Sequence, residues 1–158
     1  MTEFSAPIDD RWFEDYPFGA VYEFGDVAVT REEIVEFARQ FDPQSFHVDP
    51  VAAEAGPFGG LIASGWHTCG LMMRMFAEHY LSSVASLGSP GIDELRWPRP
   101  VRPGDRLWLR ATVTEARLSR SKPDRGLVRT LVEVFNGDSE LVLSGNAVNF
   151  LAVRPVGR

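Results

Sequence analysis

The chain has 158 residues, which suits a single domain, residues 1–158, built around one hydrophobic core. Hydrophobic residues make up 44% of it and charged residues 24%, a globular composition that excludes a disordered or fibrous protein. The net charge of −6 argues against nucleic acid as a partner, because phosphate binding needs a basic face.

The first part of the chain is predicted to form a strand followed by an amphipathic helix. The strand is expected around residues 21–29. Thr30 can cap the helix, with Glu33 three residues later as a capping box, and Pro43 disfavours helical backbone at Asp42, where the helix should end. Apolar residues at helical spacing form its buried stripe: Ile34, Val35, Phe37, Ala38 and Phe41.

A stretch rich in proline and glycine follows, with a short helical piece at 50–55, and a second helix is expected over residues 65–84. That second run is apolar around nearly its whole circumference, so it should be buried on most sides. Arg74 and Glu78 can pair one turn apart on the strip that reaches solvent. Gly70 weakens a helix, and close approach by another backbone would explain its presence.

The second half of the chain reads as antiparallel strands. Residues 107–114 and 128–134 alternate between two faces, as the side chains of a strand do. Asn136-Gly137 marks a hairpin that leads into the last strand. Two more strands and a turn complete the set: strands at 92–97 and 141–151, and a turn at 100–105.

A long buried helix followed by long antiparallel strands needs a sheet that covers the helix, and the sheet must itself bury one face. A curved sheet around a central helix meets both needs. We therefore predict an α+β hotdog fold, in which an antiparallel β-sheet wraps around a long central α-helix. One such unit has an exposed sheet edge, which invites pairing with a second copy.

Cellular location is predicted from what the chain lacks. Cys69 is the single cysteine, so no disulfide forms within the chain, which fits a reducing compartment. The first 16 residues are acidic and have no apolar signal core. The run 65–84 comes nearest to a membrane span but is too polar for one, with His67, Arg74, Glu78 and His79 within it. We expect a soluble, cytoplasmic protein with no membrane partner.

Asp42 and His47 are the first candidates for catalysis. They lie five residues apart in the segment FARQFDPQSFHVDP, just past the expected helix end. On an irregular loop, a carboxylate and an imidazole can converge on one water molecule, where one accepts its proton and the other orients it. The alternative is structural: Asp42 stabilises a turn and His47 makes structural hydrogen bonds.

The next segment, GPFGGLIASGWHT, leads into the N-terminus of the central helix. The first N–H groups of a helix have no internal partner and carry partial positive charge. Gly65 allows a ligand to approach that backbone, where an N–H can stabilise a thioester oxygen that gains negative charge. The Ser64 hydroxyl can instead serve only as the helix cap.

The two segments together resemble the MaoC-like dehydratases and R-specific enoyl-CoA hydratases. The shared pattern is a helix ending in Asp, a His five residues later, a Phe-Gly pair and an Ile-Ala-x-Gly helix start; the stretch GIDELRWPRPVRPGDRLWL resembles the family's strand–turn–strand. The resemblance covers residues 21–151. It implies Asp42 and His47 as the catalytic pair and the Gly65 N–H as oxyanion donor.

Two positions depart from the family pattern. Gln44-Ser45 stands where the family usually has Asn-Pro, and Ser64 stands where it often has His. The chain therefore reads as a subgroup in which Asp42 or the acyl chain is held differently.

The resemblance implies a hydro-lyase that adds water to, or removes it from, an enoyl or 3-hydroxyacyl thioester of coenzyme A. Coenzyme A is then part of the substrate, and no metal or other cofactor is expected. The resemblance also implies a homodimer, in which coenzyme A can span both subunits. The candidate substrate contacts in the same segment are Phe46, Gly60, Ser64 and Trp66.

Two other functions are compatible with these residues. In an acyl-CoA thioesterase, which the hotdog fold also supports, the same carboxylate would direct water at the carbonyl carbon. A non-catalytic subunit would bind an acyl thioester without converting it.

Basic residues gather in the segment SRSKPDRGLVR. Arg120 and Lys122 are predicted to bind the phosphates of coenzyme A, because guanidinium and ammonium groups bind such anions well. The alternative is a solvated hairpin tip. A second basic group, beside Trp97 and Pro98, comprises Arg96, Arg99 and Arg102.

Other sites have little support. His67 either lines the site or is a buried structural histidine, and Cys69 is assigned to the core. The sequence has no HExxH or CxxC metal motif, and no GxSxG, GxGxxG or P-loop motif.

Overall fold

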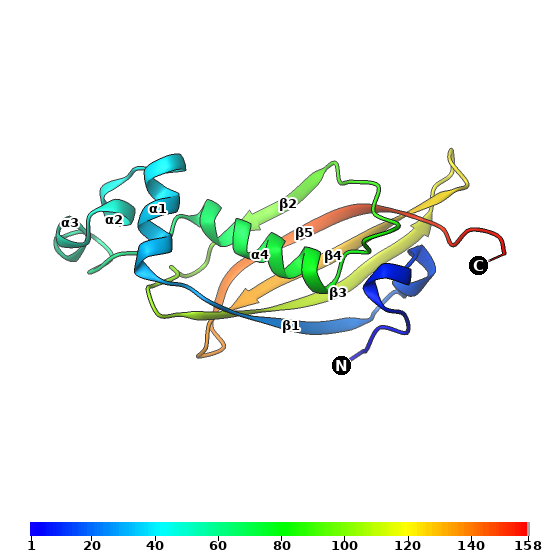
Figure 1. The fold of residues 1–158 in the computed structure, drawn as a ribbon, viewed down its shortest axis with the longest axis horizontal. Helices are drawn as coiled ribbons and strands as arrows, with labels where there is room; N and C mark the ends of the chain where they lie inside the picture. Colours follow the sequence, from blue (N-terminus) through cyan, green and yellow to red (C-terminus); the bar gives the residue numbers. More distant parts are fainter. Residues whose placement is uncertain (158) are drawn as a thin grey trace.

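The computed structural model describes residues 1–157 as a five-stranded antiparallel sheet with a long helix along its inner face (Figure 1). The strands are ordered β1-β3-β4-β5-β2, and each neighbouring pair is antiparallel. This is the predicted α+β hotdog fold. The strands are β1 (Val21–Ala28), β2 (Gly91–Arg96), β3 (Arg106–Leu118), β4 (Arg125–Phe135) and β5 (Leu141–Ala152).

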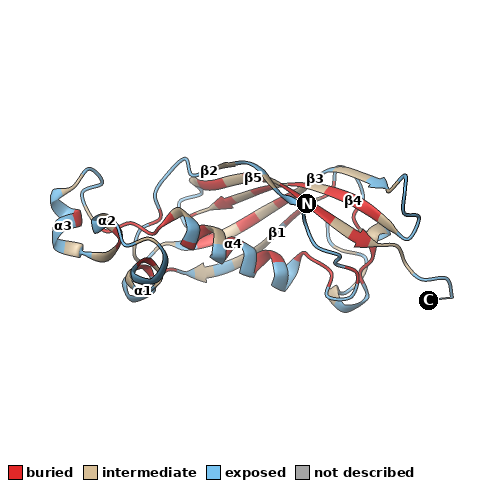
Figure 2. Cartoon of the chain, turned by 90° about the horizontal axis from the view of Figure 1, so that it is seen from above, coloured by how far each residue is buried: buried red, intermediate tan, exposed pale blue. Residues whose placement is uncertain are grey.

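The alternation predicted for the strands places the core. On β3, Leu107, Leu109, Ala111 and Val113 are buried on the side of the central helix, while Trp108, Arg110 and Thr112 between them are more exposed. The same alternation runs along β4, and Figure 2 shows the buried residues following the strands of the sheet and one side of the helix. The sheet and the helix therefore bury each other's apolar faces.

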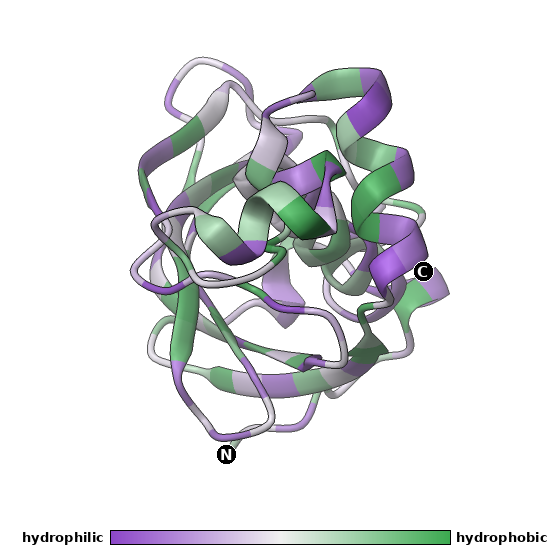
Figure 3. Cartoon of the chain, turned by 90° about the vertical axis from the view of Figure 1, so that its left-hand side faces the viewer, coloured by the Kyte–Doolittle hydropathy of each residue, from purple (hydrophilic) through white to green (hydrophobic). Residues whose placement is uncertain are grey.

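The helices at one end of the sheet are α1 (Arg31–Phe41), α2 (Ser45–Val48) and α3 (Pro50–Ala55). Thr30 caps α1 as predicted, since its hydroxyl accepts the Glu33 N–H at 3.2 Å. The helix α2 was not predicted, so His47 lies on a short helix and not on an irregular loop. Figure 3, which views the molecule from this end, shows helical segments with alternating hydrophilic and hydrophobic bands.

The central helix α4 (Gly65–His79) is shorter and less covered than its composition predicts. Trp66 and Met73 on its outer side are 58% and 44% exposed, because the sheet covers only one side of the helix. No backbone closely approaches Gly70, so that expectation was wrong. Among residues 1–157, no helix is long and apolar enough to cross a membrane.

The N-terminal segment, which includes the 3-10 turns Ile8–Asp10 and Phe13–Asp15, packs against the C-terminal end of α4. The buried Arg11 guanidinium donates to the carbonyls of His79 and Tyr80, each at 2.9 Å. A cation at the C-terminal end of a helix satisfies free carbonyls and interacts favourably with the partial negative charge of that end. The segment therefore secures the end of α4 that lies far from α1–α3.

Candidate active site

Asp42 is held by two hydrogen-bond donors. It follows the last residue of α1, and Pro43 directs the chain away from the helix. The Gln44 amide donates to its Oδ1 at 2.7 Å, and the Ser64 hydroxyl donates to its Oδ2 at 2.7 Å. Burial alone raises the pKa of Asp42, but the hydrogen bonds from Ser64 and Gln44, with the attraction of His47 when its ring is protonated, outweigh it and hold the pKa below its usual value. The carboxylate is therefore kept ionised.

His47 is buried and has a fixed orientation. Its Nδ1 lies 2.7 Å from the carbonyl oxygen of Ile62. Because a carbonyl only accepts, Nδ1 carries the hydrogen, and in the neutral ring Nε2 is left as an acceptor. Nε2 lies 3.3 Å from Oδ2 of Asp42. The two side chains that sequence reasoning paired are thus brought together.

Ser64 has two roles at the start of α4. Its hydroxyl oxygen accepts the Trp66 N–H at 3.2 Å, which makes it the predicted helix cap, and the same hydroxyl donates to Asp42. Within the part of the chain that the structure describes, the Gly65 N–H has no hydrogen-bond partner. The free N–H of Gly65 at the N-terminus of α4 therefore directly follows Ser64, whose side chain binds Asp42.

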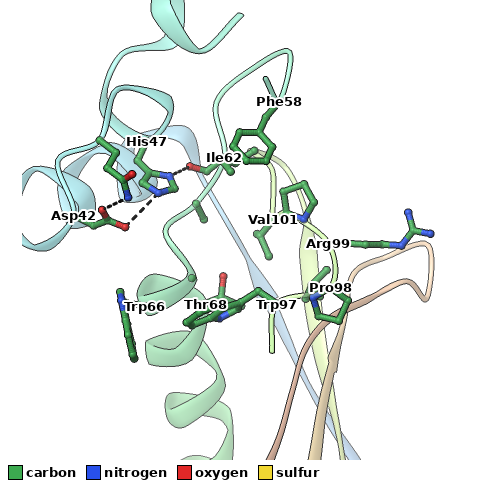
Figure 4. A pocket seen from close by; sticks show the side chains of 15 residues that line it. Asp42, His47, Phe58, Ile62, Trp66, Thr68, Trp97, Pro98, Arg99 and Val101 are labelled. Atoms are coloured by element: carbon green, nitrogen blue, oxygen red, sulfur yellow. Dashed lines mark hydrogen bonds and ion pairs between the residues drawn. The ribbon is translucent and has the colours of Figure 1, made fainter. Parts of the chain in front are cut away.

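These groups face one cavity of about 430 Å³, within the range of small-molecule sites. Figure 4 shows Asp42 and His47 on one side of it and Trp97, Pro98 and Val101 on the other. Apart from Asp42 and His47, the charged side chain in the lining is Arg99, which points away from that pair and binds Glu140 at 2.9 Å. Apolar groups make up most of the remaining wall: Phe58, Ile62, Ala63, Trp66, Trp97, Pro98, Pro100, Val101 and Val142.

The predicted substrate contacts divide into two groups. Trp66 lines the cavity, whereas Ser64 is fully buried outside the lining and contacts the lining residue Asp42. Phe46 packs on His47 and Phe58 instead of lining it, and Gly60 lies against Arg102.

The predicted phosphate contacts Arg120 and Lys122 lie on the hairpin between β3 and β4, at the opposite end of the sheet from α1–α3 (Figure 1). They are remote from the cavity of their own chain, because the long strands of the sheet carry the hairpin away from it. Arg117 and Arg125 nearby are paired with acidic neighbours, Glu115 and Asp124.

Gln44 was not predicted as a site residue. It appeared only as a departure from the family pattern, although an amide two residues after an aspartate can reach it locally. His67 does not line the cavity: it is buried and stacks on Phe37 with ring centroids 4.9 Å apart, and burial lowers its pKa. In residues 1–157, no group of three or more His, Cys, Asp or Glu side chains is arranged to hold a metal ion.

Residues 15–135 match the family model described as "MaoC like domain". The chain is 31% identical over 128 residues to the 3-hydroxyacyl-thioester dehydratase Z of Mycobacterium tuberculosis, which covers 80% of this chain and 85% of that protein. Its fold is similar to that of the MaoC-like dehydratase from Rhodospirillum rubrum, with a TM-score of 0.86 and 36% identity over 92% of this chain and 99% of the other. The R-hydratase PhaJ1 from Pseudomonas aeruginosa gives a TM-score of 0.73 and 26% identity over 91% of this chain and 86% of the other.

The family model covers well over half of the chain, and the site lies within the matched residues. This protein therefore belongs to the MaoC-like dehydratase family, as the sequence resemblance implied. The relatives support hydro-lyase activity on acyl thioesters.

Proposed function

We propose that the protein is a hydro-lyase that interconverts an enoyl thioester and a 3-hydroxyacyl thioester of coenzyme A, with Asp42 and His47 as its catalytic pair. The observation that carries the proposal is the contact of Asp42 Oδ2 with His47 Nε2 at 3.3 Å, facing an apolar cavity with the free Gly65 N–H beside it. The names of the relatives, a 3-hydroxyacyl-thioester dehydratase and an R-hydratase, support the same reaction class.

The pair is suited to holding one water molecule. With Nδ1 committed to Ile62, neutral His47 presents a bare Nε2 next to an ionised carboxylate oxygen. Both atoms are acceptors, and a water molecule can donate one hydrogen to each. Its lone pair then points into the cavity, toward the substrate.

The reaction follows from this placement. The water oxygen bonds to the β-carbon while one of its protons passes to the catalytic pair. The electron pair of the carbon–carbon double bond moves to the α-carbon, which takes up a proton to give the 3-hydroxyacyl thioester. Dehydration is the same sequence in reverse.

Negative charge reaches the thioester oxygen as water adds. The Gly65 N–H can donate to that oxygen, and a preformed donor in a site with little water stabilises it strongly. The apolar lining suits a hydrocarbon acyl group, because the lining cation Arg99 points away from the catalytic pair and is already paired with Glu140.

We propose further that the protein acts as a homodimer in the cytoplasm. β2 lies at the edge of the sheet, and the exposed Trp66 and Met73 of α4 offer apolar surface to a second copy. Antiparallel pairing of two β2 edges places the β3–β4 hairpin of one copy toward the cavity end of the other. Arg120 and Lys122 would then meet coenzyme A across the dimer.

The test is a set of enoyl-CoA and 3-hydroxyacyl-CoA substrates, followed separately by loss of conjugation and by release of thiol. We expect hydration without thiol release by the wild type, and a loss of at least about 100-fold in kcat for Asp42→Asn and for His47→Ala, the contribution typical of acid–base groups. Gln40→Ala on the outer face of α1 is the control. Near wild-type hydration by Asp42→Asn would contradict the mechanism, and thiol release would indicate a thioesterase.

A further inference from the structure

We propose that Trp97 is a specificity-determining residue: its indole forms the wall that limits the substituents an acyl group carries next to the thioester carbonyl. The inference rests on the proposed function and adds to it a restriction on the substrate class, thioesters without a branch at the α-carbon.

The first observation is the contact between Trp97 and Gly65. A methyl group added at Gly65 would lie 2.5 Å from Cε2 and 2.8 Å from Cδ2 of the indole, closer than side-chain atoms approach one another. The ring therefore rests on the backbone of the first residue of α4. The indole occupies the position that a side chain at residue 65 would take, while Gly65 still lines the cavity.

The second observation is that the indole is held on several sides. The Trp66 ring lies edge-on to it, with centroids 5.4 Å apart and an interplanar angle of 76°. The indole also lies beside the Cys69 thiol, whose pKa burial raises and the indole N–H lowers. Pro98 follows directly and restricts the backbone of Trp97 to extended conformations. Although Trp97 is 41% exposed, these contacts hold one side of its ring against the start of α4.

The Trp97 indole lies close to the position expected for the thioester group of the substrate. A thioester whose oxygen accepts the Gly65 N–H must place its carbonyl carbon beside the indole, because the ring lies against the same residue. The carbonyl carbon is bonded to the sulfur and to the α-carbon. The sulfur is common to all thioesters, whereas the substituents on the α-carbon differ between substrates. Asp42 and His47 face the cavity from the other side (Figure 4), so the indole bounds the space for a substituent on the α-carbon opposite the pair.

The test compares crotonyl-CoA with its α-methyl homologue, tiglyl-CoA. Trp97→Ala should raise the ratio of kcat/KM for tiglyl-CoA to that for crotonyl-CoA by about tenfold or more, the effect of one methyl group in a tight apolar site. Phe58→Ala is the matched control, since Phe58 is another aromatic of the cavity wall with no contact to Gly65, and its ratio should stay near that of the wild type.

A second set of variants tests the packing. Gly65→Ala keeps the backbone N–H but drives a methyl group into the indole, so it should lose at least about tenfold in kcat/KM for crotonyl-CoA, as expected when a donor and a substrate are misplaced. The double variant Gly65→Ala/Trp97→Ala should recover most of that loss, because the added methyl group no longer meets an indole. It should do so although it carries one more substitution than Gly65→Ala. Melting temperatures establish that each variant is folded.

The outcomes separate the two proposals. If the wild type hydrates crotonyl-CoA but the Trp97→Ala ratio stays within about twofold of the wild-type ratio, below the discrimination of one methyl group, the role of Trp97 is overturned and the hydro-lyase stands. Failure of the double variant to recover would overturn the packing argument in the same way. If the wild type hydrates neither thioester, the proposed function itself is wrong.

Discussion

Ser64→Ala is expected to damage both stability and catalysis, because one buried hydroxyl joins the start of α4 to the catalytic carboxylate. Ser64 is fully buried, accepts the Trp66 N–H and donates to Asp42 Oδ2 at 2.7 Å. Loss of a helix cap costs about 1 kcal/mol. Loss of a hydrogen bond to a charged group costs about 1.5–3 kcal/mol. The free energy of unfolding should therefore fall by about 2–4 kcal/mol.

Thr30→Ala is the matched control for the cap. Thr30 accepts the Glu33 N–H at 3.2 Å, the same distance as the Ser64 cap, but does not contact Asp42. It should cost about 1 kcal/mol or less and leave kcat unchanged. In Ser64→Ala, kcat should fall by about 10- to 100-fold, since the lost bond is worth one to two factors of ten in rate.

The assays are urea denaturation at fixed protein concentration and crotonyl-CoA hydration. The stability difference should also depend on pH. The pKa of Asp42 is lowered in the folded state, so the stability from its partners is present above the unfolded pKa of about 3.9 and is lost as the pH falls through the folded value. The stability difference between Ser64→Ala and the wild type should therefore shrink in acid to the ~1 kcal/mol of the lost helix cap. A variant no less stable than Thr30→Ala, with full activity, would refute the reasoning.

Three further predictions concern the rest of the chain. Arg11→Ala should lower the free energy of unfolding by about 3 kcal/mol in urea denaturation, because the His79 carbonyl loses its partner and the Tyr80 carbonyl keeps only the Tyr16 hydroxyl, while Arg11→Lys should lose less. Gly126→Ala should push a methyl group into the Phe13 ring, cost about 1–3 kcal/mol and make residues 1–20 cleavable in limited proteolysis; unchanged protection would contradict it. Met73→Glu should shift the protein from dimer to monomer in light scattering, whereas Phe18→Glu, exposed in the N-terminal segment, should not; a monomeric wild type would refute the proposed dimer.

Local patterns were enough to predict most of the framework. The alternation of Leu107, Leu109 and Val113 placed one face of β3 in the core, because side-chain direction in a strand has a period of two residues. Thr30 and Pro43 gave both ends of α1, since capping and the restriction before proline act over a few residues. Burial of the outer side of α4 was wrong, because composition alone does not say that the sheet covers only one side.

The proximity of Asp42 and His47 was predicted for a similar reason. Asp42 and His47 are five residues apart and follow a predictable helix end, so their proximity is largely a local matter. The turn of α2 that aims His47 at Asp42 was missed, since four residues carry too weak a helical pattern to be recognised.

Only the tertiary structure decided the remainder of the site. Ser64 reaches Asp42 across 22 residues, and Trp97 rests on Gly65 across 32, where neither the sequence pattern nor the spacing points to a contact. The tertiary structure also placed the β3–β4 hairpin, with Arg120 and Lys122, at the end of the sheet opposite the cavity of the same chain. The physical reason is that such contacts depend on how whole elements pack, the end of α1 on the start of α4 and the end of β2 across both, whereas periodicity and capping report only on neighbours along the chain.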